Sequence, residues 1–154
     1  MLAWPVLLGI QHVALIVSDL ERSQRFYGEQ LGMEELQRPS NFGFAGAWYR
    51  AGGQEIHLIA AADTSAKPGW GNPGPRADVG LATHLAFEVD DLNAECARLS
   101  SIGVDACSEQ RPRGDGVVQI YFEDPDRHLV ELFQHTGADQ SNTPARLPVT
   151  EAES

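Results

Sequence analysis

Four side chains that can bind a metal ion occur as two pairs with nearly the same spacing. The first pair is His12 and His57, and the second pair is His84 and Glu131. The shift from His12 to His84 is 72 residues (84 − 12), and the shift from His57 to Glu131 is 74 (131 − 57). Imidazole nitrogens and carboxylate oxygens are common ligands of divalent cations. Because the four positions recur together, they indicate a shared pocket rather than ordinary packing.

The segments around these residues also repeat. HVALIVSDL, which begins at residue 12, and HLAFEVDDL, which begins at residue 84, are identical at five of nine positions. Further along, IHLI from residue 56 matches VELF from residue 130. Repetition at a fixed shift predicts two copies of one module, each about seventy residues long.

Each copy shows the same order of predicted elements. Short β-branched segments at 10–17 and 82–89 alternate as strands do, and a helix capped by an Asp or Ser follows each and ends at a glycine. Three further strands are predicted in each copy, at 33–36, 46–50 and 54–60, and at 104–107, 117–123 and 128–134. The module is therefore predicted to be βαβββ.

Domain boundaries follow from this repeat. The first module is predicted over 9–62 and the second over 81–136. The Pro- and Gly-rich segment 63–80 is predicted to be a linker or a lid over the site, the latter because it contains Trp70. The tail 137–154 lacks apolar periodicity, which predicts a mobile segment or an arm on a partner subunit.

Composition limits the class of protein. Hydrophobic residues make up 42% of the 154 and charged residues 21%, as in a folded domain. A net charge of −11 disfavours nucleic acid, which needs a basic surface. The apolar segment 1–10 has no positive start or cleavage site and is too short to span a membrane, so we expect a cytoplasmic protein without a membrane segment. Cys96 and Cys107 are expected to be reduced.

Glu131 stands in the apolar run LVELF. A buried carboxylate without a partner costs several kcal/mol or raises its own pKa. A divalent cation would remove that cost, which favours the metal-site hypothesis.

The segments HVALIVSDLERSQRFYGEQLGM, HLAFEVDDLNAECARLSSIGV and FEDPDRHLVELFQ resemble the vicinal-oxygen-chelate superfamily. That group includes glyoxalase I, extradiol dioxygenases, fosfomycin-resistance enzymes and bleomycin-binding proteins, and the resemblance covers residues 9–135. It implies an α+β fold in which two βαβββ modules form curled mixed sheets, or half-barrels. It also implies a small-molecule substrate, a homodimer, and metal ligands on the first and last strands of each module, where His12, His57, His84 and Glu131 stand.

This sequence departs from individual members of the family. Glyoxalase I usually has a carboxylate where this chain has His57, and an arginine that grips glutathione where this chain has Ile16. The resemblance to glyoxalase I therefore does not imply that this chain is specific for glutathione. Bleomycin-binding relatives lack the metal ligands, and the phosphonate contacts of fosfomycin-resistance enzymes do not occur after Asp115.

The number of ligands separates two kinds of chemistry. Four ligands favour Ni, Zn, Co or Mn acting as a Lewis acid, in a lyase or isomerase that holds two neighbouring substrate oxygens and moves a proton. Three ligands, namely His12, His84 and Glu131, favour an Fe(II)-dependent dioxygenase. The proton-transfer base is predicted to be Glu131 or Glu55. A non-catalytic protein that binds a small molecule or an antibiotic is the third hypothesis.

Several other residues are candidates for substrate contact. Trp48 and Tyr121 are predicted to line the pocket, although aromatic residues on strands more often belong to a core. Arg111 and Arg113 are placed to hold an anionic group or to lie on a solvated surface. Further aromatic candidates are Phe42, Phe44 and Tyr49, and His128 and His135 are expected to face solvent.

Overall fold

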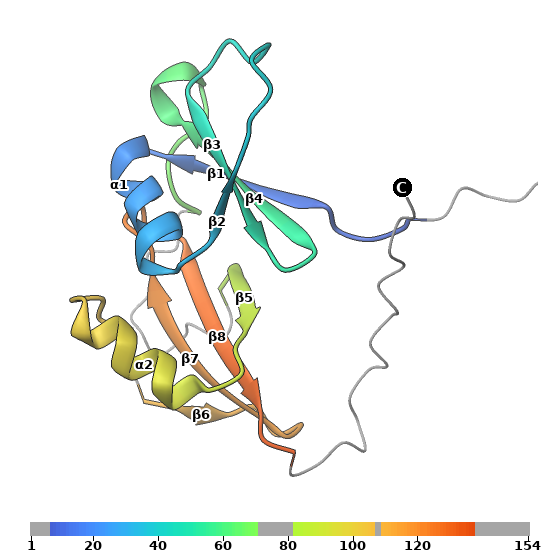
Figure 1. Ribbon diagram of the computed structural model, residues 1–154, viewed down its shortest axis with the longest axis vertical. Helices are drawn as coiled ribbons and strands as arrows, with labels where there is room; N and C mark the ends of the chain where they lie inside the picture. The colour runs from blue at the N-terminus through green and yellow to red at the C-terminus, as the bar shows by residue number, and fades with distance from the viewer. Residues whose placement is uncertain (1–6, 71–81, 107–108, 138–154) are drawn as a thin grey trace, which may run out of the picture.

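The computed structural model describes residues 7–70, 82–106 and 109–137. It contains two four-stranded sheets, which lie one above the other in Figure 1. The first has the order β1-β4-β3-β2, with β1 His12–Val17, β2 Glu34–Leu36, β3 Gly46–Ala51 and β4 Gln54–Ala60. The second has the order β5-β8-β7-β6, with β5 His84–Glu88, β6 Arg111–Pro112, β7 Val117–Glu123 and β8 Leu129–His135.

The two sheets share one topology, which confirms the predicted α+β fold of paired βαβββ modules. In each sheet the first strand lies parallel to the last, and the remaining pairs are antiparallel. Ala14 on β1 is opposite His57 on β4, and Ala86 on β5 is opposite Glu131 on β8. The same register in both modules therefore places each candidate ligand pair beside a small alanine.

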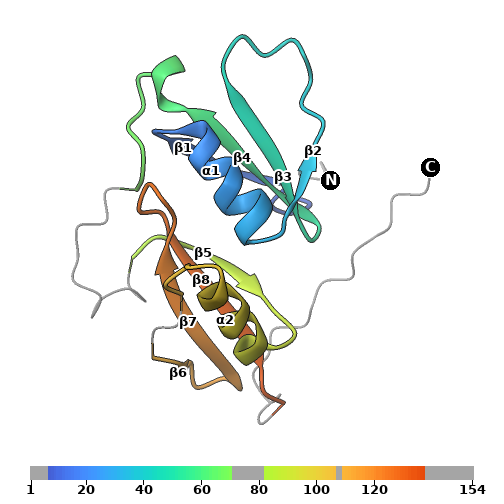
Figure 2. The same ribbon diagram turned by 60° about the vertical axis from the view of Figure 1, so that its left-hand side comes forward.

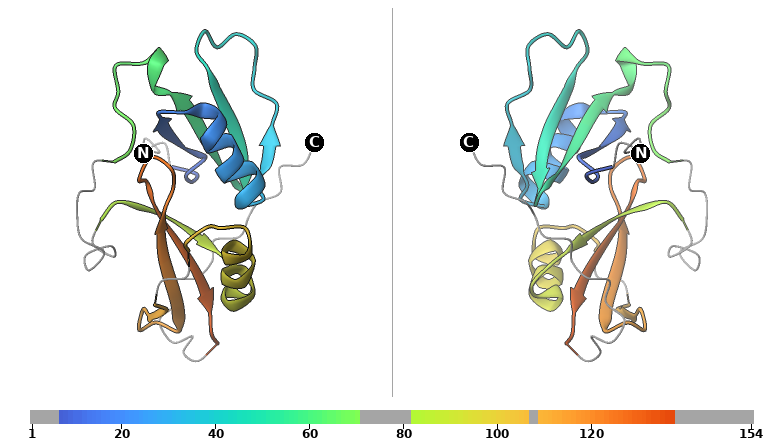
Figure 3. Two further views of the ribbon diagram at one scale, coloured as in Figure 1. Left: turned by 90° about the vertical axis from the view of Figure 1, so that its left-hand side faces the viewer. Right: turned by 90° about the vertical axis from the view of Figure 1, so that its right-hand side faces the viewer.

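A helix covers one face of each sheet (Figures 2 and 3). Asp19 caps α1 (Leu20–Gln24), which continues as a π-helical turn, η1 (Arg25–Gln30), and Asp91 caps α2 (Leu92–Ser101). In each cap the carboxylate accepts a backbone N–H three residues on, as the sequence predicted. A short 3₁₀ turn, η2 (Ala61–Asp63), follows β4.

Alternation along the strands divides each sheet into a core face and an open face. The side chains beneath the helices are buried and apolar, and they include Leu15, Val17, Ile56, Leu58, Ile120, Val130 and Leu132. The histidines of β1, β4 and β5 and Glu131 of β8 occupy the alternate strand positions. Their side chains therefore belong to the opposite face of each sheet. The candidate ligands therefore stand on the faces that the helices leave uncovered.

One predicted strand is wrong. Residues 104–106 form no strand, and the outer strand of the second sheet is β6, which is two residues long and pairs with β7. A tight connection explains the difference, since the Val104 N–H donates to the Leu99 carbonyl at 2.9 Å and this bond ends α2 rather than starting a strand. Gly103 supplies the positive φ of 80° that this helix end requires.

A buried polar cluster of Tyr27, Asp124 and His128, called the intermodule latch below, joins the two modules. The Tyr27 hydroxyl donates to Asp124 Oδ2 at 2.9 Å, and His128 Nδ1 lies 2.8 Å from the same oxygen. Asp124 Oδ1 accepts the backbone N–H groups of Asp126 and His128. All four acceptor positions of a buried carboxylate are thus occupied, with the Tyr27 bond crossing between modules.

The latch corrects the expectation that His128 faces solvent, because this side chain is fully buried. Trp70 packs edge-on against it, with ring centroids 5.2 Å apart. Next to Trp70, Gly69 has φ +74°, and a Cβ there would lie 2.5 Å from the Asp126 carbonyl oxygen, so only glycine fits. Trp70 therefore belongs to the module junction, and most of the predicted lid, 71–80, lies outside the described residues.

Residues 138–154 of the predicted tail also lie outside the described part of the chain. Within the described residues, no helix has the length and apolar character needed to cross a membrane.

Candidate metal centre

Three aromatic rings form a stack on the open face of the first sheet. The imidazoles of His12 and His57 are nearly parallel, with ring centroids 4.2 Å apart and an interplanar angle of 11°. The Trp48 ring covers the other face of the His57 ring, with centroids 4.1 Å apart and an interplanar angle of 5°. Pairing of β4 with both β1 and β3 produces this stack, since Trp48 is directly opposite His57 across the ladder. The His57 ring is therefore held on both faces.

Hydrogen bonds indicate which nitrogens of this pair are free to bind a cation. His57 Nε2 lies 2.7 Å from Glu55 Oε2, and this bond is the main reason that the pKa of Glu55 is lowered. An ionised carboxylate only accepts, so Nε2 carries a proton, and Nδ1 is the nitrogen with a lone pair when the ring is neutral. His12 Nδ1 lies 2.5 Å from the Gln11 side-chain oxygen, which leaves His12 Nε2 with a lone pair.

The second pair has a more exposed histidine and a buried carboxylate. His84 Nδ1 lies 2.7 Å from the carbonyl oxygen of Ala82, so Nδ1 donates. Its other nitrogen, Nε2, faces Glu131 Oε2 at 3.0 Å, and Glu131 is only 3% exposed. If His84 is neutral, two lone pairs face each other at hydrogen-bond distance, and either a proton or a cation between them removes the repulsion.

The other oxygen of Glu131, Oε1, is buried and lacks a hydrogen-bond partner among the described residues. The nearest cation is Arg113, whose Nη1 lies 3.8 Å away, beyond hydrogen-bond distance. A buried carboxylate with one oxygen lacking a hydrogen-bond partner and the other facing an imidazole nitrogen fits a metal ligand.

Tyr121 completes the surroundings of Glu131. Its ring meets the His84 ring edge-on, with centroids 5.5 Å apart, and it is directly opposite Glu131 in the β7–β8 ladder. Burial, together with a hydrogen bond to Glu131, raises the pKa of Tyr121 to about 12. The phenol therefore stays protonated at neutral pH and donates to the carboxylate.

The two predicted arginines differ in their surroundings. Arg113 is held by Asp115 through three contacts of 2.8–3.0 Å and lies 5.3 Å over the Phe133 ring. The hydrogen bonds to Asp115 raise the pKa of Arg113 and lower that of Asp115. Arg111 is exposed on β6. Of the two, Arg113 lies near a candidate ligand, and two of its three guanidinium nitrogens already bond Asp115.

The four candidate ligands form two pairs on different sheets, and the described part of one chain does not bring the pairs together. Within it, no group of three or more His, Cys, Asp or Glu side chains is placed to hold one metal ion. Glu55 lies with the first pair and Tyr121 with the second. Each module therefore carries one pair of the four candidate ligands.

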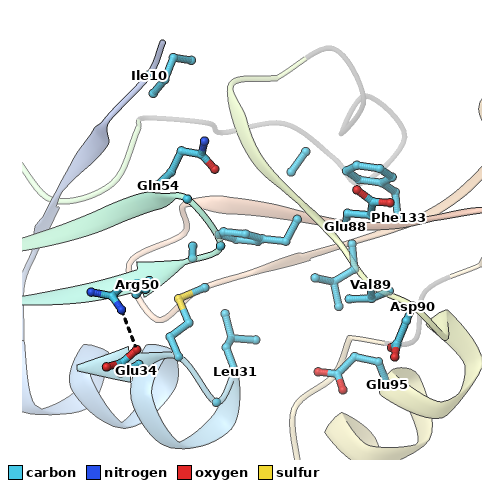
Figure 4. Close-up of a pocket in the computed structure, with 18 of the residues that line it drawn as sticks. Ile10, Leu31, Glu34, Arg50, Gln54, Glu88, Val89, Asp90, Glu95 and Phe133 are labelled. Atoms are coloured by element: carbon cyan, nitrogen blue, oxygen red, sulfur yellow. Dashed lines mark hydrogen bonds and ion pairs between the residues drawn. The ribbon is translucent and has the colours of Figure 1, made fainter. Parts of the chain in front are cut away.

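A broad groove of about 1390 Å³ runs between the modules on the side shown in Figure 4. The first module contributes Ile10, Leu31 and Gln54, and the second contributes Glu88, Val89 and Phe133. Leu8 also lines the groove, and Leu7, Leu8 and Ile10 are 101%, 95% and 72% exposed. None of the four candidate ligands is among the described residues that line it.

Sequence reasoning missed residues on the loop between β2 and β3. The Arg38 guanidinium carbon lies 4.5 Å from the ring centroid of Phe44 and 5.0 Å from that of Phe42. Phe42 in turn meets Trp48 edge-on at 5.5 Å. Phe42 and Phe44 were predicted only as general aromatic candidates, and Tyr49, from the same group, is a core residue that is 1% exposed. The sequence signal for this loop is an arginine, Arg38, followed within a few residues by Phe42 and Phe44.

Comparison with known proteins decides the family. The family model described as Glyoxalase/Bleomycin resistance protein/Dioxygenase superfamily matches residues 9–132. This chain belongs to that superfamily. A lactoylglutathione lyase from Neisseria meningitidis is 32% identical over 142 residues, with 87% of this chain and 96% of the relative covered. A probable lactoylglutathione lyase from Vibrio parahaemolyticus is 32% identical over 137 residues, covering 84% and 92%.

Solved structures of superfamily members show the same fold. A glyoxalase family protein from Bacillus anthracis has a TM-score of 0.68 at 24% identity, covering 86% of this chain and 99% of that one. A fosfomycin resistance protein from Listeria monocytogenes has a TM-score of 0.62 at 23% identity, covering 84% and 94%. At these identities the likeness supports the two-module fold and leaves the reaction to the chemistry of the site.

Proposed function

We propose that this superfamily member is a divalent-metal-dependent enzyme of the glyoxalase-like lyase or isomerase type. The observation that carries the proposal is the buried Glu131 carboxylate, whose Oε2 lies 3.0 Å from His84 Nε2 and whose Oε1 has no hydrogen-bond partner among the described residues. Relatives named lactoylglutathione lyase support the reaction class. The substrate class proposed is a small molecule with two oxygens on neighbouring carbons.

The ligand set fits a metal ion when two copies of the chain are considered. His12 and His57 of one copy would supply nitrogens, and His84 and Glu131 of a second copy would supply a nitrogen and an oxygen. Two features support a homodimer. The strands β1 and β5, which carry a histidine each, lie at the edge of their sheets, and the exposed Leu7, Leu8 and Ile10 precede β1. Isologous pairing of two copies would complete two identical sites.

The residues of this chain divide the chemical work. A bound divalent cation supplies Lewis-acid polarisation of the two substrate oxygens. Glu55 is ionised at neutral pH, with its pKa lowered mainly by the hydrogen bond to His57, and it takes the proton from the substrate carbon and returns it to the neighbouring carbon. Trp48 and Tyr121 flank the histidines and exclude water from the reacting carbons.

Metal analysis of the purified protein, prepared without chelator, tests this proposal. We expect one Ni, Zn, Co or Mn ion per chain, and loss of that ion in His84→Ala. Glu55→Gln is expected to keep the metal and to lose turnover by about 10²–10⁴-fold, as for removal of a general base. A protein that holds no divalent ion under these conditions, or a Glu55→Gln variant with full turnover, contradicts the proposal.

A second candidate function is supported by the position of His57. Its ring is covered on both faces and its Nε2 is held by Glu55, so only Nδ1, the nitrogen nearer the backbone, remains for a cation. If His57 does not coordinate, the remaining set is two histidines and one carboxylate, which suits Fe(II) and dioxygenase chemistry. Substrate-dependent O₂ uptake after anaerobic loading with Fe(II) distinguishes this candidate from a lyase.

A further inference from the structure

The loop of residues 37–45, between β2 and β3, places an exposed phenyl ring beside the candidate metal centre. Phe42 is 38% exposed, and its ring contacts Trp48 edge-on with centroids 5.5 Å apart. Trp48 is stacked on His57 at 4.1 Å, and His57 on His12 at 4.2 Å. A continuous row of aromatic rings therefore leads from the two histidines to an apolar side chain that is open to solvent.

The loop is fixed in shape at both ends. Arg38 Nη2 donates to the Phe44 carbonyl at 2.6 Å, and the Arg38 guanidinium lies against the rings of Phe42 and Phe44. The Ala45 N–H donates to Asp63 Oδ2 at 2.6 Å. Because the loop is already held in one shape, a ligand that binds Phe42 does not have to order it. Binding therefore avoids the entropic part of the free-energy cost that a mobile loop would add.

The chemistry of this wall selects one kind of ligand group. Phe42, Phe44 and Trp48 offer ring faces and edges, and the charge of Arg38 is directed to a backbone carbonyl and to the rings. Aromatic rings attract one another in edge-on and offset geometries beyond simple area burial. Phe42 lies beyond Trp48 as seen from His57, with successive ring-centroid separations of 5.5 and 4.1 Å, so contact with Phe42 favours a phenyl-sized substituent over a methyl group.

We propose that Phe42 and Trp48 form a specificity wall that favours substrates with an aromatic or bulky apolar substituent on the carbons that carry the neighbouring oxygens. This inference rests on the proposed metal-dependent function. The inference specifies the substrate class of that function as aryl-substituted rather than methyl-substituted compounds. Phe42 acts here as a specificity residue, and Arg38 as a positioning residue that holds the loop.

Two small hydroxamates test the wall without any turnover. Benzohydroxamate and acetohydroxamate both chelate a metal through the same two oxygens and differ in carrying a phenyl or a methyl group. The protein is loaded with Co(II), whose visible absorption changes on chelation, and each compound is titrated. The readout is the ratio of the two dissociation constants measured on the protein. It is divided by the ratio of the dissociation constants that the two compounds have for free Co(II). This ratio cancels any general effect of a variant on the metal site or on assembly.

We expect the protein to prefer benzohydroxamate by roughly tenfold after correction, and Phe42→Ala to reduce the preference by about three- to tenfold. Phe42→Leu, which keeps apolar bulk, is expected to fall between these values. Ile102→Ala is the matched control, because Ile102 is an apolar side chain of similar exposure, 45%, at the end of α2.

The possible failures are distinguishable. An unchanged ratio in Phe42→Ala, with both compounds still altering the Co(II) spectrum, overturns the specificity wall and leaves the proposed function standing. Absence of any spectral change with either compound, in protein that holds Co(II), overturns the proposed chelation chemistry and the wall with it.

Discussion

Replacing Tyr27 by Phe removes one hydroxyl group from the intermodule latch and leaves the ring in place. Tyr27 is fully buried, and its hydroxyl donates at 2.9 Å to Asp124 Oδ2, a carboxylate that is itself only 4% exposed. A buried hydrogen bond to a charged group contributes about 1.5–3 kcal/mol. Since Asp124 keeps its bonds to His128 and to two backbone N–H groups, we expect the free energy of unfolding to fall by about this amount and no more.

Urea denaturation measures this loss, and in a chain of 154 residues it corresponds to a fall in Tm of roughly 3–12 °C. Tyr49→Phe is the matched control, because Tyr49 is 1% exposed but its hydroxyl is bonded to the neutral amide of Gln24. Its expected loss is about 0.5–1.5 kcal/mol. All samples are compared at one protein concentration, because assembly contributes to apparent stability. If Tyr27→Phe lowers the free energy of unfolding by no more than Tyr49→Phe does, the intermodule latch does not hold the modules as described.

Four further outcomes are expected. Glu131→Gln should weaken metal binding by at least roughly 100-fold, measured by competition with a chromophoric chelator, because a neutral amide replaces a charged ligand. Absorbance at 295 nm should show no tyrosine ionising near pH 10 in the folded protein, whereas protein in urea titrates there, because Tyr27, Tyr49 and Tyr121 all have raised pKa values. Since the phenols are protonated in the folded state, stability should be full below pH 10 and fall as the pH rises from about 10 towards 12, where Tyr121 ionises. Leu58→Ala, at a site with no exposed surface, should cost about 2–5 kcal/mol in urea denaturation.

The repeat made the fold predictable. Matching segments at a nearly constant shift placed two βαβββ modules, and the period-2 alternation of 12–17 and 84–88 identified the core face of each first strand. Both helix caps were visible as aspartates before apolar periodic segments. These features depend on neighbouring residues in the chain, which is why sequence alone was sufficient for them.

Contacts between distant residues were not predictable in the same way. His128 follows a turn signal, which favours exposure, yet it is buried because Tyr27, 97 residues before Asp124, completes the latch. The sequence of residues 124–128 does not indicate that Tyr27 is their hydrogen-bond partner. The short strand β6 was missed for a related reason, since two residues carry no alternation of their own and only their pairing with β7 defines the strand.

The candidate site was predictable by residue and only partly by geometry. The pairing of His12 with His57, and of His84 with Glu131, follows from the repeat because first and last strands are neighbours in each module. The separation of the two pairs within one chain depends on how the modules pack against each other. That packing is governed by the latch and by the junction of Phe26 with Phe122, whose rings lie 6.2 Å apart.

Complementation between two inactive variants tests the central claim, a metal site shared between two copies of the chain. His12→Ala and His84→Ala are each expected to lose the metal. In a heterodimer of the two, purified through different tags, one site carries both changes and the other carries neither. The shared-site account predicts one tightly bound metal ion per heterodimer and none in either parent homodimer. A heterodimer that binds no metal, or a monomer of the unaltered chain that binds a full ion, would contradict it.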